Sequence, residues 1–485
     1  MRGPTIDWLR ELDIAAEIPP VGELGSPQSL PSCGDWAIAL AIRKLAVPDD
    51  HDDLRAMVTG TSRARLSALM GLGALGFHSD LDVLRTSFVE GMSLQGLVAA
   101  WAFGRCAGPS DEGEVCQLLS HTDSVYRFAG AWGFALLGGF GDERVIQEAL
   151  AGTFPESRWA GVEAARTRGG SALLGRVRPL ALDPDKEVRK ATLRFLGSNG
   201  SLGDFGPLTA WDSDWHGLRV GEAVVSASKR GDLADLVSLV LSDRRRGSSD
   251  LIKAIEKLLE PDDMATFLPW LDDPPSRRHL HLALHVVAKL GSRNNLPRVT
   301  ELLLQESRLI EEDPDDTFCN PSCADVAFSA LVGPEDIDLV RQFSRHGSRY
   351  LRNAAVKALK RLGTRADLRP LLAKLRHGGA MYFNVEESIL RLLTTDDAPL
   401  VNQLLHRRRA GLRAFGLECA KDLRLNGQFD VIAEMMIHDR NAWVRRKSAE
   451  TLVTLATRTS WPGLLEAART GGSIPSETIP SDRGS

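Results

Sequence analysis

The chain has 485 residues, of which 43% are hydrophobic and 25% charged, and its formal net charge is −5. These values are the averages of ordinary folded proteins, so they disfavour wholesale disorder and collagen-like repeats, and no apolar run reaches the roughly 18 residues of a membrane span. Aromatic residues make up only 6% of the chain, which favours helices over β-sheet.

The first 54 residues lack the repeat that fills most of the chain. They contain two helical stretches, IDWLRELDIAAEI and DWAIALAIRKLA, on either side of a linker rich in Pro, Gly and Ser. We expect residues 1–54 to form a divergent helical cap. Acidic residues interrupt the stretch where a signal peptide needs an apolar core, and six scattered cysteines are too few for a disulfide framework. The sequence therefore predicts a cytoplasmic protein with reduced thiols.

Residues 55–470 repeat one helical pattern. Each copy has an anchor position that is often Arg, a small residue three places later and Leu at about seven, as in ARLSALMGLGALG and YLRNAAVKALKRLG. A unit of about 31 residues holds two helices and two short turns, and neither helix buries its apolar face without a neighbouring unit. The sequence predicts an all-α solenoid, a superhelix of about 12 to 13 helical hairpins. The anchors are 29 to 32 residues apart, except for one step of 42, and lie at 65, 97, 127, 158, 189, 219, 251, 280, 322, 352, 383, 413 and 445.

Two repeats share a pair of charged residues at the same offset. Asp183 precedes Arg189 by six residues, and Asp439 precedes Arg445 by six residues. The Asp stands in the turn before the second helix, where a carboxylate accepts hydrogen bonds from the unpaired N–H groups of the helix start. The Arg on the helix is placed to reach the carboxylate of an adjacent turn. His or Arg replaces the Asp in other repeats, so we expect a discontinuous ladder.

This pattern resembles the HEAT-repeat family, and its short period is similar to the HEAT-like repeats of phycobilisome lyases. The resemblance covers about residues 55–470. It implies a superhelical fold and a binding function, and it implies that Asp183, Arg189, Asp439 and Arg445 form a ladder between neighbouring repeats. The family includes scaffolds, adaptors, lyases and DNA-repair enzymes, so the resemblance leaves the function open.

The 42-residue step contains an acidic stretch, EEDPDDTFCNPSC, which predicts a loop insertion near 305–323. We interpret Cys319 and Cys323 in this stretch as fortuitous, because no second Cys or His pair stands at zinc-site spacing. His281 and His285 are four residues apart and share a helical face, but no third ligand is evident. We therefore predict no metal and no cofactor. Residues 471–485 lack apolar periodicity and are predicted to be disordered.

Charge is segregated along the chain. Residues 1–340 contain 34 basic and 50 acidic residues, whereas residues 341–447 contain 22 basic and 10 acidic residues. Since repeats stack in sequence order, one end of the array is predicted to be basic. This predicts a patch for an acidic protein or a nucleic acid, and solvated helix faces are the alternative. The candidate partner-binding residues are Arg345, Arg349, Arg407, Arg408, Arg409, Arg446 and Lys447.

No catalytic constellation stands out among the many acidic and polar residues. We therefore predict a non-enzymatic scaffold or adaptor that holds a protein partner on the concave face of the solenoid. One alternative is a nucleic-acid-binding HEAT protein that uses the basic C-terminal repeats. The other is an enzyme of the HEAT-like lyase or DNA-glycosylase type.

Overall fold

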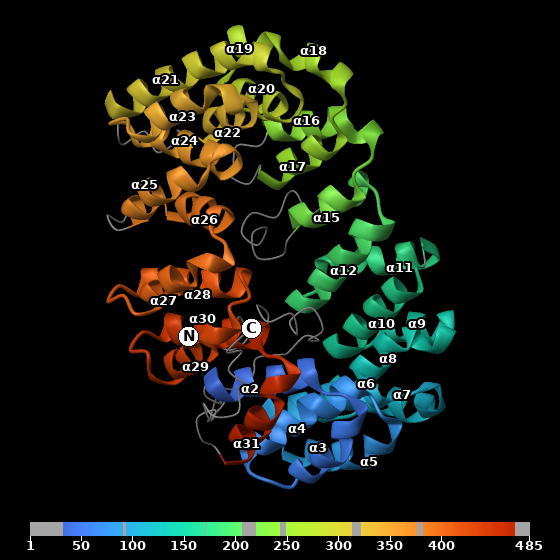
Figure 1. Ribbon diagram of the computed structural model, residues 1–485. Helices are drawn as coiled ribbons and strands as arrows, with labels where there is room; N and C mark the ends of the chain where they lie inside the picture. Colours follow the sequence, from blue (N-terminus) through green and yellow to red (C-terminus); the bar gives the residue numbers. More distant parts are fainter. Residues whose placement is uncertain are drawn as a thin grey trace. The chain divides into compact units, whose positions relative to one another are not determined.

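The computed structural model describes residues 33–90, 94–169, 171–205, 220–242, 249–312, 322–375 and 382–470. In these ranges every regular element is an α-helix or a short 3-10 helix, and no strand is present (Figure 1). The all-α prediction is confirmed. Part of the predicted cap, residues 1–32, and the predicted tail, residues 471–485, lie outside the described residues.

Contacts divide the chain into two units. Unit 1 comprises Met1–Arg219 together with Ala398–Ser485, and unit 2 comprises Val220–Asp397. Within each unit the repeating element is a hairpin, in which a first helix, often entered through a 3-10 turn, is followed by a second helix. Figure 1 shows this for unit 1. There α7 (Glu112–Leu119), α9 (Glu143–Leu150) and α11 (Leu174–Val177) form one layer, and α8 (Ser124–Leu136), α10 (Pro155–Arg168) and α12 (Lys186–Asn199) form the other.

The described part of unit 1 begins with helix α2 (Cys33–Leu45), and the helix that pairs with it as a hairpin comes from the other end of the chain. The hairpins that follow α2 are α3 (His51–Met57) with α4 (Ser62–Leu75), α5 (Leu81–Thr86) with α6 (Leu94–Cys106), α7 (Glu112–Leu119) with α8 (Ser124–Leu136), α9 (Glu143–Leu150) with α10 (Pro155–Arg168), and α11 (Leu174–Val177) with α12 (Lys186–Asn199). The C-terminal part of the unit contains α27 (Ala398–Leu405) with α28 (Ala410–Asp422), α29 (Phe429–His438) with α30 (Ala442–Leu455), and α31 (Trp461–Thr470).

Unit 2 has the same construction. Residues 305–312 of the predicted acidic loop belong to its longest helix, α21, and residues 313–321 lie outside the described residues. Its elements are α15 (Val220–Ala227), α16 (Leu233–Ser242) with α17 (Ser249–Leu258), α18 (Met264–Phe267) and α19 (Pro269–Asp272) with α20 (Arg277–Leu290), α21 (Leu296–Glu312) with α22 (Ser322–Leu331), α23 (Ile337–Ser344) with α24 (Arg349–Leu362), and α25 (Arg365–Leu375) with α26 (Tyr382–Leu392).

The small residue after each anchor lies where the two helices of a hairpin meet. A Cβ added to Gly161 on α10 would come within 2.8 Å of the backbone nitrogen of Leu150, the last residue of α9. At Gly416 on α28 the corresponding distance to the Leu405 nitrogen is 3.0 Å. Gly130 on α8 lies at the same position, where an added Cβ would come within 2.7 Å of the Leu119 nitrogen, and alanines at this position, among them Ala283 on α20, are fully buried. The repeat therefore keeps a small residue at this position because the backbones of the two helices approach each other closely there.

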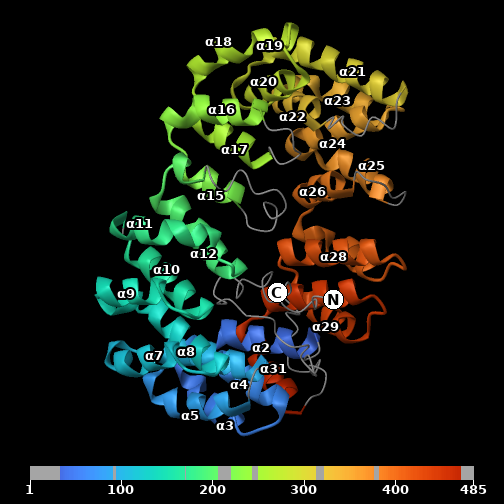
Figure 2. The ribbon, with the colours of Figure 1, turned by 180° about the vertical axis from the view of Figure 1, so that it is seen from behind.

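The two ends of the chain form one hairpin inside unit 1. Helix α2 (Cys33–Leu45) packs between α30 and α4 in the row of second helices. Helix α31 packs against α2 and serves as the first helix of this hairpin, with α2 as the second. Figures 1 and 2 both show α2 beside α31. The predicted cap boundary at residue 54 falls inside α3, so no boundary separates a cap from the repeats there. Helix α2 has a neighbouring second helix on each side, so it is an internal member of the stack and not its terminal helix.

Candidate protein-interaction surface

The recurring Arg of the anchor position holds the turn of its own hairpin. Nη1 of Arg158 donates to the carbonyl oxygens of Gly152 (3.1 Å) and Thr153 (2.8 Å), which lie six and five residues earlier. The same two offsets recur for Arg189 and Arg413, with distances of 2.7 to 3.0 Å. The guanidinium thus satisfies carbonyl groups left unpaired after the first helix.

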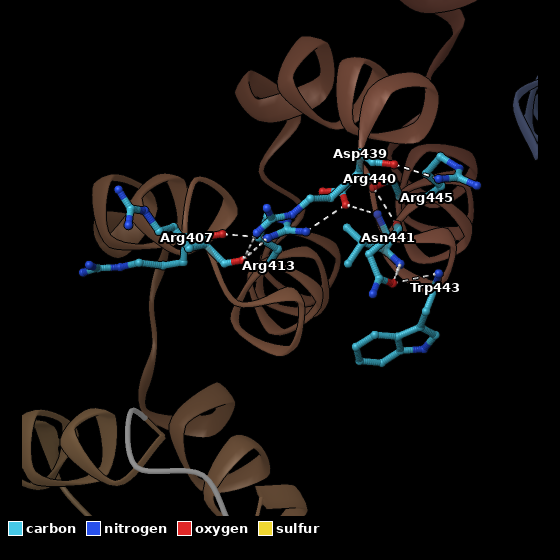
Figure 3. A network of polar contacts seen from close by, with 10 residues as sticks. Arg407, Arg413, Asp439, Arg440, Asn441, Trp443 and Arg445 are labelled. Carbon is cyan, nitrogen blue, oxygen red and sulfur yellow. Dashed lines mark hydrogen bonds and ion pairs between the residues drawn. The ribbon is translucent and has the colours of Figure 1, made fainter.

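Some anchors also bind the next repeat. Nε and Nη2 of Arg158 donate to both carboxylate oxygens of Asp183, at 2.6 and 2.9 Å. Arg413 binds Asp439 in the same way, at 2.6 and 2.8 Å, and both side chains are more than nine-tenths buried. Figure 3 shows this second pair. A bidentate Arg–carboxylate pair fixes both distance and orientation, so each rung locks two successive turns together.

The ladder therefore differs in one respect from the expectation. Asp183 and Asp439 accept from the preceding anchor, Arg158 and Arg413, which sequence reasoning did not name as ladder residues. Arg189 donates to the backbone carbonyl of Asp183, and Arg445 donates to that of Asp439 at 2.8 Å. The available signal was the spacing of 25 or 26 residues between an anchor Arg and the Asp that follows it.

The environment of Asp439 keeps it charged. Burial raises the pKa of its carboxyl group, but hydrogen bonds from Arg413 and from the Asn441 backbone N–H outweigh this effect, and the pKa lies below the usual value of 3.8. Asn441 in turn accepts hydrogen bonds from the N–H groups of Trp443 and Val444 and caps α30. The turn before α30 is thus fixed at both ends.

These two fixed turns present a set of exposed side chains that we call the turn edge. It consists of Arg407, Arg408 and Arg409 before α28, and Arg440 and Trp443 at the start of α30. All five are exposed, and Trp443 retains 48% of its accessible surface. Nη2 of Arg440 donates to the carbonyl oxygen of Arg408 at 2.9 Å and so joins the two turns. In Figure 3 the side chains of Arg407 and Trp443 point away from the Arg413–Asp439 pair.

Two of the predicted partner-binding residues lie elsewhere in unit 1 and have carboxylate partners. Lys447 on α30 binds Glu418 on α28 at 3.1 Å and Glu450 at 3.0 Å, and Arg446 also binds Glu450. Burial lowers the pKa of Lys447, but the hydrogen bonds with both glutamates outweigh it and raise the pKa. Arg446 and Lys447 thus belong to a charge-compensated row on the second helices and not to the turn edge.

Arg345 and Arg349 lie in unit 2, at the turn between α23 and α24. Arg345 is exposed. Arg349 donates to the Tyr350 hydroxyl at 2.7 Å, and its guanidinium carbon lies 4.9 Å from the centre of that ring. Arg345 and Arg349 belong to the other unit and are not part of the turn edge.

Hairpins stacked in two layers, with arginine rungs between successive turns, define an α-solenoid in each unit. No family model and no curated protein matches the chain. Within the described ranges, no helix combines the length and apolar character needed to cross a bilayer.

Three solved structures are among those with similarity to the chain. An engineered protein has 13% identity and a TM-score of 0.22, with 84% of this chain and 99% of that chain covered. Importin beta, crystallised in ammonium sulfate, has 12% identity and a TM-score of 0.35, with 93% and 67% covered. A structure of microtubule polymerases with tumor overexpressed gene domain arrays has 13% identity and a TM-score of 0.18, with 82% and 99% covered. The fold assignment rests on the helices and rungs of this chain itself.

Proposed function

We propose that the chain is a non-enzymatic scaffold that binds an acidic segment of a partner protein at the turn edge. The observation that supports this is the exposure of Arg407 and Arg408 before α28 and of Trp443 at the start of α30, in two turns that Arg440 joins. Among the described residues neither guanidinium has a hydrogen-bonded or ion-paired partner, and Trp443 is 48% exposed. Trp and Arg are the residue types that most often dominate the binding energy of protein interfaces.

The turn edge is a better candidate for the partner site than the layer of second helices. Charges on the second helices compensate one another, as in the ion pair of Arg194 with Glu163 and that of Lys447 with Glu418. A partner would have to displace those pairs. Arg407 and Arg408 have no ion-paired partner among the described residues, and the Arg413–Asp439 rung holds the backbone of the turn edge in place, which reduces the ordering cost of binding. The cytoplasmic location stays a prediction.

The test is a charge reversal at the turn edge. The variant Arg407→Glu/Arg408→Glu should still fold, because the backbone carbonyl groups of these residues, and not their guanidinium groups, bind Arg413. A partner captured from a lysate of the source organism with the wild-type chain should associate with this variant at least about tenfold more slowly at low salt, while dissociation changes less. The variant Trp443→Ala should act mainly on dissociation.

A matched control reverses two exposed arginines elsewhere in unit 1. Arg144 on α9 and Arg176 on α11 are both exposed, so Arg144→Glu/Arg176→Glu changes the net charge equally. Equal slowing of association by both variants would reduce the effect to net charge and would refute a specific surface. Binding of a 20-nucleotide single strand that weakens steeply with salt and disappears in Arg407→Glu/Arg408→Glu would instead make the turn edge a nucleic-acid site.

A further inference from the structure

Three chemically active side chains meet on the second helices of unit 2. They are Glu256 on α17, His285 on α20 and Cys323 on α22. Nδ1 of His285 lies 3.0 Å from Oε1 of Glu256, and Nε2 lies 3.4 Å from Sγ of Cys323, within hydrogen-bonding distance for sulfur. The result is a continuous chain of carboxylate, imidazole and thiol. In such a chain the carboxylate orients the imidazole, and the imidazole exchanges a proton with the thiol.

The positive charge in this cluster lies on His285. Burial lowers the pKa of His285, but the hydrogen bonds with Cys323 and Glu256 outweigh it and raise the pKa to about 9. His281, one helical turn earlier, behaves in the opposite way. Burial, together with the charges of Arg277 and His285, lowers its pKa to about 4. At neutral pH the cluster therefore holds an imidazolium at His285 and a neutral imidazole at His281.

The geometry is that of a relay and not of a metal site. His285 directs its two nitrogens to different partners, Glu256 on one side and Cys323 on the other. In the described part of the chain no three His, Cys, Asp or Glu side chains converge on a point where a metal ion would be held. His285, which shares a helical face with His281, thus has Glu256 and Cys323 as its hydrogen-bond partners.

The position of Cys323 in its helix adds to the effect of His285. Cys323 is the second residue of the ten-residue helix α22. Unpaired backbone N–H groups and the positive end of the helix dipole favour a negative charge at that place. An imidazolium beside the sulfur and a helix start behind it are the surroundings in which a cysteine acts as a nucleophile. Cys323 is only 6% exposed, so a reagent must be small to reach it.

We propose that Cys323 is a nucleophilic thiol that reacts once per chain with a small hydroperoxide and becomes a sulfenic acid. The Cys323 thiolate attacks one peroxide oxygen, and a sulfur–oxygen bond forms as the oxygen–oxygen bond breaks. Sulfur is oxidised by two electrons, and the peroxide is reduced. The leaving group is hydroxide from hydrogen peroxide or alkoxide from an alkyl hydroperoxide, and it takes the proton of the His285 imidazolium and departs as water or as an alcohol. Glu256 is a positioning residue, because it contacts His285 and not sulfur.

The first test compares cysteines within the same chain. The full-length protein is treated with hydrogen peroxide at pH 7, trapped with dimedone and analysed by peptide mass spectrometry. Cys116 is the internal control, because it is more exposed than Cys323, while burial and the charge of Glu112 raise its pKa. Cys323 should be labelled at least about tenfold faster than Cys116. Equal or slower labelling of Cys323 would overturn the proposal.

The second test separates the relay from simple accessibility. His285→Gln should slow the labelling of Cys323 at least about tenfold. Glu256→Gln should slow it about threefold, because the imidazole remains but loses the carboxylate that orients it and supports its positive charge. The matched control is His281→Gln, which lies one turn away on the same helix and should leave the rate within about twofold. Thermal unfolding confirms that each variant is folded. An unchanged rate in folded His285→Gln would also refute the proposal, and if that variant fails to fold, the comparison with Cys116 decides. This proposal is independent of binding at the turn edge.

Discussion

Arg458, which precedes the last described helix, binds Asp50, which precedes the first hairpin. Its Nη1 and Nη2 donate to the two carboxylate oxygens of Asp50 at 2.7 and 3.1 Å. Arg230 binds Asp263 of the next hairpin in the same bidentate way, at 2.8 and 2.6 Å. In both cases the Arg is the first residue of one 3-10 helix, and the Asp is the last residue of the 3-10 helix that begins the following hairpin. The chain ends are therefore joined by the contact that joins consecutive repeats.

A second type of contact between consecutive repeats is also present where the two chain ends meet, which we call the junction. Nζ of Lys44, near the end of α2, donates to the carbonyl oxygens of Val453 (2.9 Å) and Thr454 (2.8 Å) at the end of α30. Lys257 on α17 donates to two carbonyl oxygens at the end of α15 in the same manner. A cation at the C-terminal end of a helix stabilises its unpaired carbonyl groups. Helix α2 thus follows α30 as one second helix follows another.

The ion pair of Arg458 with Asp50 at the junction should contribute to the stability of the fold. In Arg458→Ala the nearly buried carboxylate of Asp50 loses its bidentate partner, so we expect the free energy of unfolding to fall by about 1 to 3 kcal/mol. Urea denaturation measures the change. Arg469→Ala is the control, because its partner Asp53 is 62% exposed, and that variant should stay within about 0.5 kcal/mol. Equal effects of the two variants would contradict a special role for Arg458.

Removal of the last helix should be far more damaging. Trp461, Leu464 and Leu465 of α31 are buried, and their loss would expose the face of α2 that they cover. At about 1.5 to 3 kcal/mol for each buried apolar side chain, a chain that ends at residue 456 should lose more than about 5 kcal/mol. A chain that ends at residue 470 keeps α31 and should unfold like the full chain. Matching unfolding curves for all three chains would show that α31 is dispensable.

The rung below the turn edge should be one of the costliest to break. Arg413 and Asp439 are 8% and 6% exposed, and Arg413→Ala leaves the carboxylate buried without its partner. We expect a loss of about 3 to 5 kcal/mol in chemical denaturation. As a control, Arg144→Ala breaks the exposed pair with Glu148 and should change stability by less than about 0.5 kcal/mol. A small change in Arg413→Ala would mean that solvent replaces the rung.

The same rung should make stability depend on acid. The pKa of Asp439 lies below 3.8 in the folded chain, so near that pH the folded state binds fewer protons than the unfolded state. The stabilisation is complete above about pH 5 and is lost as the pH falls through the folded pKa. Asp439→Asn should therefore reduce the difference in unfolding free energy between pH 5 and pH 3. An unchanged difference would show that another carboxylate controls this range.

The relay predicts the opposite trend at high pH. The pKa of His285 is raised from 6.5 to about 9, so between these values the folded state binds more protons than the unfolded state. The stabilisation is complete below pH 6.5 and is lost as the pH rises through about 9, by at most about 3 kcal/mol. Denaturation curves at pH 6.5, 8 and 9.5 measure the loss. His285→Gln should remove most of this dependence, and its persistence would point to another group.

Part of the turn edge could be predicted from the sequence. The basic run of residues 407–409 is visible as three consecutive arginines in a turn between helical patterns. The exposure of Trp443 could not be predicted in this way. A Trp at the start of a helix is usually buried, and its exposure depends on which neighbouring segment covers it. Arg446 and Lys447 were assigned to the same patch, but their carboxylate partner Glu418 lies on another helix and its proximity is a result of stacking.

The sequence by itself determined the repeating hairpins. Their period follows from backbone geometry within about 31 residues: an Arg that returns to carbonyl groups five and six residues earlier, and a small residue where two helices touch. Only the tertiary structure decided which distant groups meet. Asp50 and Arg458 are 408 residues apart, and Cys323 is 38 residues from His285. Such pairs depend on the rotation of each helix about its axis and, for Asp50 and Arg458, on the join between the chain ends, and packing within each unit sets both.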